Sequence, residues 1–168
     1  MRCDECGFVY EDVPVADIPA RLRALGPPYA EALRHDGDDL RAHPIDRTWS
    51  ALEYACHLRD VLLVQRERLA LALAEDEPTF TPMRREERVI ELRYNEQATA
   101  EVAKQLAAAA GALADAFADL GEDQWQRRVI YNYPKPWSRT LAWVGQHTVH
   151  EGVHHLGDVE RVLGSIDR

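Results

Sequence analysis

The sequence has no long apolar run and no cluster of basic residues, and both absences exclude classes of function. No stretch approaches the roughly 18 apolar residues that a membrane span needs, so we expect no embedded segment. The formal net charge of the 168-residue chain is −9, and no Lys/Arg cluster offers the basic face that duplex binding requires. Nucleic acid is therefore set aside as a partner, and a small-molecule substrate is expected instead.

Cysteine is also scarce, and the N-terminus has no apolar signal-peptide core. Only three cysteines occur among the 168 residues, which does not resemble a secreted disulfide framework. We therefore expect a reducing, cytoplasmic setting. Runs of β-branched residues are few, whereas Ala and Leu are frequent in an apolar content of 46%. Such a composition favours a packed helical globule with one continuous core.

Two of the three cysteines form a motif near the N-terminus. Cys3 and Cys6 enclose a Cys-x-x-Cys that is followed by Gly7 and by Phe-Val-Tyr, an arrangement typical of rubredoxin-type metal knuckles. The glycine lets the turn fold back so that backbone amides point at the sulfurs. We therefore expect a knuckle segment at residues 1–14 and a separate helical domain at residues 15–168.

The knuckle supplies only two ligands of a second metal site, and a structural zinc needs four. No second Cys-x-x-Cys exists in the chain. The other ligands would have to be Cys56, a histidine such as His35 or His43, or groups of another subunit. A redox dithiol and an ordered turn with two free thiols are the alternatives.

Helical periodicity predicts an all-α four-helix bundle. The first helix begins at Asp17 as N-cap and is interrupted at Gly26-Pro27-Pro28. The second opens with the capping box Ser50-x-x-Glu53, and Gly164 is the expected stop of the fourth. We expect helices over residues 17–33, 50–74, 95–119 and 138–163, joined by connections at 35–48, 75–94, 122–127 and 131–137.

Four of the seven histidines lie within residues 147–155, on the predicted fourth helix. Helical i, i+4 spacing permits the pairs His147/Glu151, His150/His154 and Glu151/His155, and spacing alone does not choose between them. At about 100° per residue, Glu151 and His155 fall in or beside the apolar arc that faces the bundle. His150 and His154 fall on the opposite side, and His147 lies at the edge, as a neighbour of the inward pair.

A carboxylate on an apolar stripe is costly unless it is paired or binds a metal. Together with His57 on the stripe of the second helix, Glu151 and His155 meet that requirement with one divalent ion. Two histidines and one carboxylate leave coordination positions open, which is typical of catalytic zinc and also suits iron or nickel. A hydrogen-bonded Glu–His pair without metal is the alternative, as is a core role for His57.

The connection before the third helix is the most basic local segment of this acidic chain. Arg93 and Tyr94, at its end, are the candidate contacts to an anionic substrate. A solvated helical turn is the alternative interpretation.

Two motifs resemble the DinB-like superfamily of metal-binding four-helix bundles: Trp49-Ser50-x-x-Glu53-x-x-x-His57 and His154-His155-Leu156-Gly157-Asp158. The resemblance implies His57, Glu151 and His155 as ligands, and a homodimer. Most members have His where this chain has Glu151. A carboxylate there is similar to the mycothiol-dependent maleylpyruvate isomerase branch, although this chain lacks the extra C-terminal domain of that isomerase and carries an unusual knuckle.

Three functions are compatible with these features. The first is a metal-dependent thiol transferase or isomerase that uses a low-molecular-weight thiol of the mycothiol or bacillithiol type, because a bound metal deprotonates a thiol. The second is a hydrolase in which water takes the place of the thiol. The third is a non-enzymatic metal- or thiol-binding module.

Overall fold

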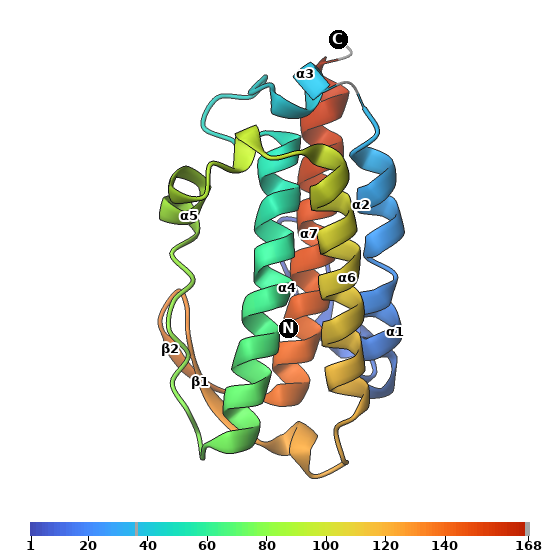
Figure 1. Cartoon of the computed structure of the whole chain (residues 1–168). Coiled ribbons are helices and arrows are strands. Elements are labelled where there is room, and N and C mark those ends of the chain that lie inside the picture. The colour runs from blue at the N-terminus through green and yellow to red at the C-terminus, as the bar shows by residue number, and fades with distance from the viewer. Residues whose placement is uncertain (36, 167–168) are drawn as a thin grey trace.

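The computed structural model describes residues 1–35 and 37–166, and it is a four-helix bundle (Figure 1). The first column of the bundle is a broken helix, and the other three columns are long, uninterrupted helices. The broken helix consists of α1 (Ile18–Arg23) and α2 (Gly26–Ala32). The three long helices are α4 (Ala51–Ala74), α6 (Thr99–Ala118) and α7 (Leu141–Ile166). Helix α4 packs on α6 and α7, and α1 packs on α6 and α7 from the other side. The predicted all-α bundle is confirmed.

Local sequence signals account for the helix boundaries. Ser50 Oγ accepts a hydrogen bond from Glu53 N at 3.1 Å, and Ser50 N donates to Glu53 Oε2 at 2.8 Å, so the predicted capping box is confirmed. The interruption at Gly26 separates α1 from α2. Asp17 stands at the N-cap position of α1, but its side chain makes no capping hydrogen bond.

Small side chains bring the helices together. In α6, Ala109, Ala110 and Ala114 are buried in the core. A Cβ built on Gly26 would lie 3.2 Å from Ala107 Cβ, so α2 approaches α6 closely. The many alanines of α6 therefore serve close helix packing.

Three predicted boundaries are wrong. The loop expected at 35–48 contains helix α3 (Gly37–Arg41), whose Leu40 is fully buried. The third helix begins at Thr99 rather than 95, because a 3₁₀ turn, η3 (Tyr94–Glu96), and extended backbone at Gln97 precede it. Helix α7 continues past Gly164, and partly buried Ile166 packs against the core.

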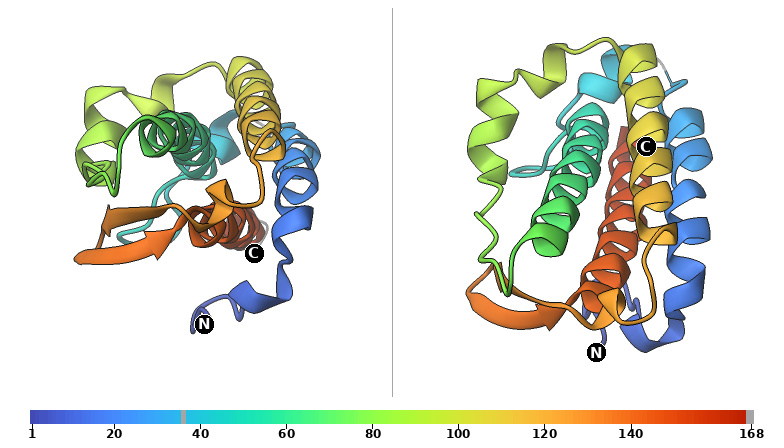
Figure 2. Two further views of the ribbon diagram at one scale, coloured as in Figure 1. Left: turned by 90° about the horizontal axis from the view of Figure 1, so that it is seen from below. Right: turned by 60° about the horizontal axis from the view of Figure 1, so that its bottom comes forward.

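A β-hairpin replaces the irregular connection predicted before the fourth helix. Strands β1 (Arg128–Asn132) and β2 (Pro136–Thr140) are antiparallel, and a cis peptide precedes Pro134 between them. Val129 and Tyr131 alternate inward on β1. The backbone of Ile130 also exchanges hydrogen bonds with Pro78 and Phe80 at 2.9 Å each, so the connection after α4 lies along this hairpin. Figure 2 shows the hairpin at one end of the bundle, beside α7.

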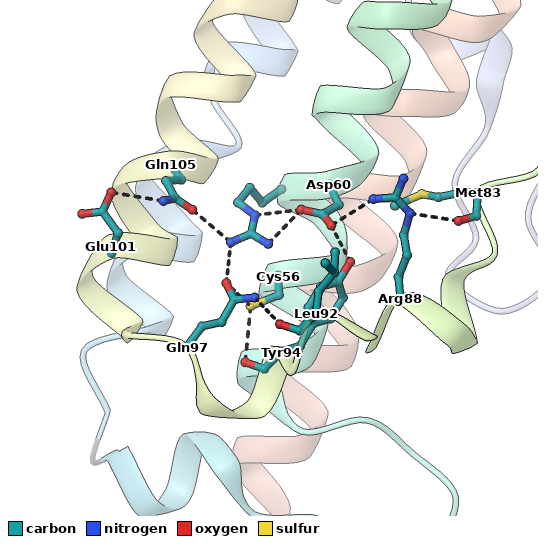
Figure 3. Close-up of polar contacts among 10 residues, drawn as sticks. Cys56, Asp60, Met83, Arg88, Leu92, Tyr94, Gln97, Glu101 and Gln105 are labelled. Atoms are coloured by element: carbon teal, nitrogen blue, oxygen red, sulfur yellow. Dashed lines mark hydrogen bonds and ion pairs between the residues drawn. The ribbon is translucent and has the colours of Figure 1, made fainter. Parts of the chain in front are cut away.

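A buried ionic network attaches the connection between α4 and α6 to the bundle (Figure 3). Asp60 on α4 forms a 2.8 Å ion pair with Arg59, and both side chains are less than 10% exposed. The same carboxylate accepts a hydrogen bond from the Tyr94 hydroxyl at 2.6 Å and lies 3.4 Å from Arg88 on α5 (Arg85–Glu91). The network fixes the segment that leads from α5 into α6.

The first ten residues lie against α7, beside the bundle (Figure 2). Two further 3₁₀ turns, η1 (Tyr10–Asp12) and η2 (Val15–Asp17), lead from them into α1, and η4 (Gln124–Gln126) precedes β1. Among the described residues, none of the helices combines the length and apolar content that a bilayer span requires.

Candidate metal centre

Three side chains from two helices meet near the middle of the bundle. His57 projects from α4, and Glu151 and His155 project from α7, one turn apart. One donor atom from each residue lies within 4.8 Å of the donor atoms of the other two. The rings of His57 and His155 are 5.0 Å apart between centroids. The structure therefore brings together the three residues that the helical wheel selected.

Hydrogen bonding orients His155 toward the centre. Its Nδ1 lies 2.9 Å from Asp158 Oδ2, and its Nε2 lies 3.6 Å from Glu151 Oε2. The second distance is too long for a hydrogen bond. It matches the separation of about 3–3.6 Å that two ligands adopt around one ion with metal–ligand bonds of about 2.0–2.2 Å. An outer carboxylate on the far nitrogen is the usual support of a metal-binding histidine.

Burial and neighbouring charges set the protonation of the three groups. Burial, together with nearby His155, lowers the pKa of His57 to about 3, so the imidazole is neutral at pH 7. Burial alone would raise the pKa of Glu151, but its histidine partners hold it well below the ordinary value. Burial opposes the charge on His155, yet Asp158 and Glu151 raise its pKa to about 9. A cation at this point would take the place of the proton on His155.

His57 also fits a ligand role because no hydrogen bond explains its position. Its Nδ1 is buried without a hydrogen-bond partner in the described part of the chain. A buried polar atom left unpaired costs about 1–3 kcal/mol. The donor set, two imidazoles and one carboxylate, is the kind that binds zinc, iron or nickel and leaves positions open for other groups.

The three ligand candidates open into a cleft of about 880 Å³. The N-terminal segment forms one wall, the residues just before and within α5 form another, and the β-hairpin contributes Tyr131 and Tyr133. A site between helices with an open mouth is suited to a small molecule.

His147 lies beside Glu151, as predicted. Its Nε2 is 3.7 Å from Glu151 Oε1, and its Nδ1 is 2.9 Å from the Tyr10 hydroxyl. Burial lowers the pKa of His147 to about 4, so this ring is neutral at pH 7. It also stacks on Trp143, with ring centroids 4.7 Å apart.

The sequence model of the DinB superfamily matches residues 20–159 of this chain. The chain belongs to the DinB superfamily. Two solved structures share the fold of this DinB bundle. YfiT from Bacillus subtilis, described as a probable metal-dependent hydrolase with an unusual four-helix bundle topology, is 18% identical. Its TM-score is 0.79, and the match covers 89% of this chain and 87% of YfiT.

The second structure is a mycothiol-dependent maleylpyruvate isomerase, which is 15% identical with a TM-score of 0.69. The match covers 93% of this chain and 68% of the isomerase. No curated protein matches this chain.

The structure places Arg93 and Tyr94 away from the cleft of the DinB bundle. Arg93 is exposed and forms an ion pair with Glu96, and Tyr94 is fully buried in the network around Asp60. Neither side chain is among those that line the cleft.

Arg68 and Tyr131 line the cleft instead, and the sequence analysis missed both. The guanidinium of Arg68 lies 5.2 Å from the centre of the Tyr131 ring. A signal for Arg68 exists in the sequence. It follows His57 by eleven residues, a rotation that places the two side chains about 20° apart on the same helix face.

The N-terminal cysteines do not meet the partners expected for them. Cys56 is buried in α4 and donates to Tyr94 O, and His43 lies 2.9 Å from Glu53 Oε2. His35 is exposed. Cys3 and Cys6 instead lie with His150 and His154, the two histidines that the wheel directs away from the bundle centre.

Proposed function

We propose that this DinB protein is a metal-dependent enzyme whose centre is formed by His57, Glu151 and His155. The metal would be zinc, nickel or iron, and the reaction would be the transfer or isomerisation of a substrate through a low-molecular-weight thiol such as mycothiol or bacillithiol. A divalent ion at this centre would lower the pKa of a bound thiol and so supply a nucleophile at neutral pH. The observation that carries the proposal is a set of three ligand groups that faces an open cleft.

The carboxylate favours the thiol reaction over the other candidates. Glu151 makes the donor set two histidines and one glutamate, the set that the resemblance to the mycothiol-dependent isomerase branch implies. The structural likeness to such an isomerase supports the same class of chemistry. Because this chain spans only 68% of that isomerase, we propose the thiol step and leave the isomerase's own substrate out of the proposal.

Residues around the centre have separate tasks in this proposal. His147 is neutral, its Nδ1 lies 2.9 Å from the Tyr10 hydroxyl, and its Nε2 lies 3.7 Å from Glu151 Oε1, so in this proposal it packs beside the carboxylate and limits its movement. Arg68, whose Nη1 lies 3.4 Å from the Tyr131 hydroxyl, contributes positive charge to the cleft wall. An anionic or carbonyl-bearing substrate suits that wall.

A hydrolase is the second candidate, because the YfiT structure, described as a probable metal-dependent hydrolase, resembles this chain at a TM-score of 0.79. The same three ligands would serve, with water in place of the thiol. Activation by a metal ion applies to water as well as to a thiol.

One experiment distinguishes the thiol-dependent enzyme from the hydrolase. The purified chain is loaded with zinc, nickel or iron and assayed for conjugation of an electrophile, with and without mycothiol or bacillithiol. We expect thiol-dependent conjugation that His57→Ala abolishes and that His35→Ala, a change at an exposed histidine outside the cleft, leaves intact. Incorporation of labelled water into product without any thiol would favour the hydrolase, and no turnover with any metal would leave the binding-module alternative.

We further propose a cytoplasmic homodimer, as the resemblance and the cysteine usage imply. Light scattering coupled to gel filtration tests the dimer, and a single-chain mass at micromolar concentration would refute it.

A further inference from the structure

The N-terminal hairpin, which runs from Arg2 to Val9, holds the thiols of Cys3 and Cys6 close together. Gly7 N donates to Cys3 O at 3.0 Å, and Cys3 N donates to Phe8 O at 2.9 Å. Gly7 has a φ of +74°, a conformation that side chains disfavour, so the glycine allows the chain to fold back. Arg2 and Val9 pair as an antiparallel bridge that closes the hairpin. This is the local geometry of a metal knuckle, although Cys3 and Cys6 alone do not make a site.

The N-terminal hairpin packs against the outer face of α7. The rings of Phe8 and Tyr10 pack against His150, with centroids 5.3 and 5.4 Å away. One turn further along α7, His154 Nε2 lies 3.4 Å from Glu5 Oε2, on the loop between the two cysteines. The two aromatic contacts and the polar contact place the thiols directly over two histidines with i, i+4 spacing.

We propose that Cys3, Cys6, His150 and His154 form a second, structural zinc site that fastens the N-terminal hairpin to α7. One donor atom from each of the four residues lies within 4.8 Å of the other three. Ligands at the corners of a tetrahedral zinc site are about 3.3–3.8 Å apart, so small movements of these side chains would close the site. In the described part of the chain, this is the one candidate group that offers four donors.

Unpaired nitrogens on the two histidines point to a missing ligand. Both ring nitrogens of His150 and Nδ1 of His154 are buried without hydrogen-bond partners among the described residues. His150 Nδ1 lies 3.4 Å from Glu151 Oε1, without the geometry of a hydrogen bond. An ion that takes one nitrogen from each ring would account for two of these three nitrogens. The carboxylate of Glu5 is placed to support His154 from outside.

The charges and protons of the site balance. Binding of Zn²⁺ releases one proton from each cysteine to solvent, and the two thiolates neutralise the charge of the ion while both imidazoles bind as neutral ligands. The backbone amides of Cys6 and Glu5 hydrogen-bond to the Cys3 sulfur. Such bonds to sulfur are typical of cysteines that bind metal.

The second site shares no ligand with the first, yet it shapes the same cleft. His150 and His154 each precede a ligand of the first centre by one residue, so they lie about 100° away around α7. Cys3, Asp4 and Glu5 form part of the cleft wall. The structural ion would thus hold that wall in place without entering the reaction.

Metal content of the full-length chain tests the site. Expressed with zinc and purified under reducing conditions, the protein should contain two zinc ions per chain by elemental analysis. Cys3→Ser with Cys6→Ser should lower the content to one, His57→Ala should also lower it to one, and the triple variant should contain none. Cys56→Ala is the matched control and should keep both ions, because Cys56 lies in the bundle core.

Cobalt absorption gives a second readout, and its first measurement uses the unaltered protein. The unaltered protein loaded with Co²⁺ should show thiolate-to-cobalt charge-transfer absorption in the near ultraviolet, which His57→Ala should retain and Cys3→Ser with Cys6→Ser should lose. The proposal is overturned if that absorption is absent from the unaltered protein or if the double serine variant retains the full zinc content. A Cys3–Cys6 disulfide in the protein purified under reducing conditions would overturn it too. Loss of thiol-transfer activity alone bears on the first centre and not on this one.

Discussion

Helix α7 packs so closely against Leu25, between α1 and α2, that there is no room for a side chain at Gly152. A Cβ on Gly152 would lie 2.4 and 2.5 Å from the two methyl carbons of Leu25 and 3.0 Å from its Cγ. Leu25 is itself buried, at 5% exposure, and cannot swing into solvent. The Tyr29 hydroxyl donates to Gly152 O at 2.8 Å, which also fixes the spacing of the two helices. Gly152→Ala must therefore displace Leu25 or α7.

Two opposing contributions to the free energy of unfolding determine how much Gly152→Ala changes stability. Alanine is favoured over glycine inside a helix by about 0.8–1.0 kcal/mol. Forcing an extra carbon into a packed core costs about 1–3 kcal/mol, and three contacts at or below 3.0 Å place this site at the upper end. We expect Gly152→Ala to lower the free energy of unfolding by about 2 kcal/mol. For a chain of this size the melting temperature should fall by about 4–8 °C.

Gly157 on the same helix is the matched control. No atom lies within 4 Å of a Cβ built there, so only the helix-propensity term applies. Gly157→Ala should raise the free energy of unfolding by about 0.8–1.0 kcal/mol and the melting temperature by about 2–4 °C. Thermal and denaturant unfolding followed by circular dichroism measures both. If the two variants shift in the same direction, the close contact of α7 with Leu25 is not what limits Gly152.

Two further predictions concern the bundle and its thiols. Asp60→Ala leaves the buried Arg59 and the partly buried Arg88 without their carboxylate and should lower the free energy of unfolding by about 3–5 kcal/mol. Asp46→Ala, at a fully solvated carboxylate, should change it by about 0.5 kcal/mol or less. Equal effects in denaturant unfolding would contradict a buried network. Burial raises the pKa of the Cys56 thiol to about 12, so alkylation of the folded, metal-free chain at mildly alkaline pH should modify Cys3 and Cys6 and spare Cys56. Mass spectrometry counts the adducts, and three adducts before unfolding would refute the buried thiol.

Sequence patterns predicted the features that depend on a single helix or on one regular period. The capping box at Ser50 is a local hydrogen-bond exchange, and it is present in the structure. The apolar arc of α7 selected Glu151 and His155 because rotation about a straight helix is fixed at about 100° per residue. His57 joins them because its own helix packs on α7 with that face inward.

Features that depend on how separate segments meet were not predictable in the same way. On β1, the ring of Tyr131 packs against Phe80 and against Trp143 of α7. The five residues of this strand were too short a pattern to interpret beside two prolines. Cys56, His35 and His43 do not lie beside Cys3 and Cys6, because the N-terminal hairpin packs against His150, which is more than 140 residues away in the sequence. No periodicity within either segment encodes that contact.

The order of residues in α7 explains how one short stretch of helix can present two sets of donors on different faces. His150 and His154 are four residues apart, and Glu151 and His155 repeat the same spacing one residue later. Each pair is aligned along the axis because four residues are about one turn, and the offset of one residue rotates the second pair by about 100°. One pair therefore faces the hairpin and its thiols, and the other faces His57 across the bundle. Glu151 lies at the boundary, with one oxygen 3.4 Å from His150 and the other 3.6 Å from His155. A histidine there would add a fifth imidazole to this stretch of α7, whereas the carboxylate places a negative charge beside the position proposed for the divalent ion.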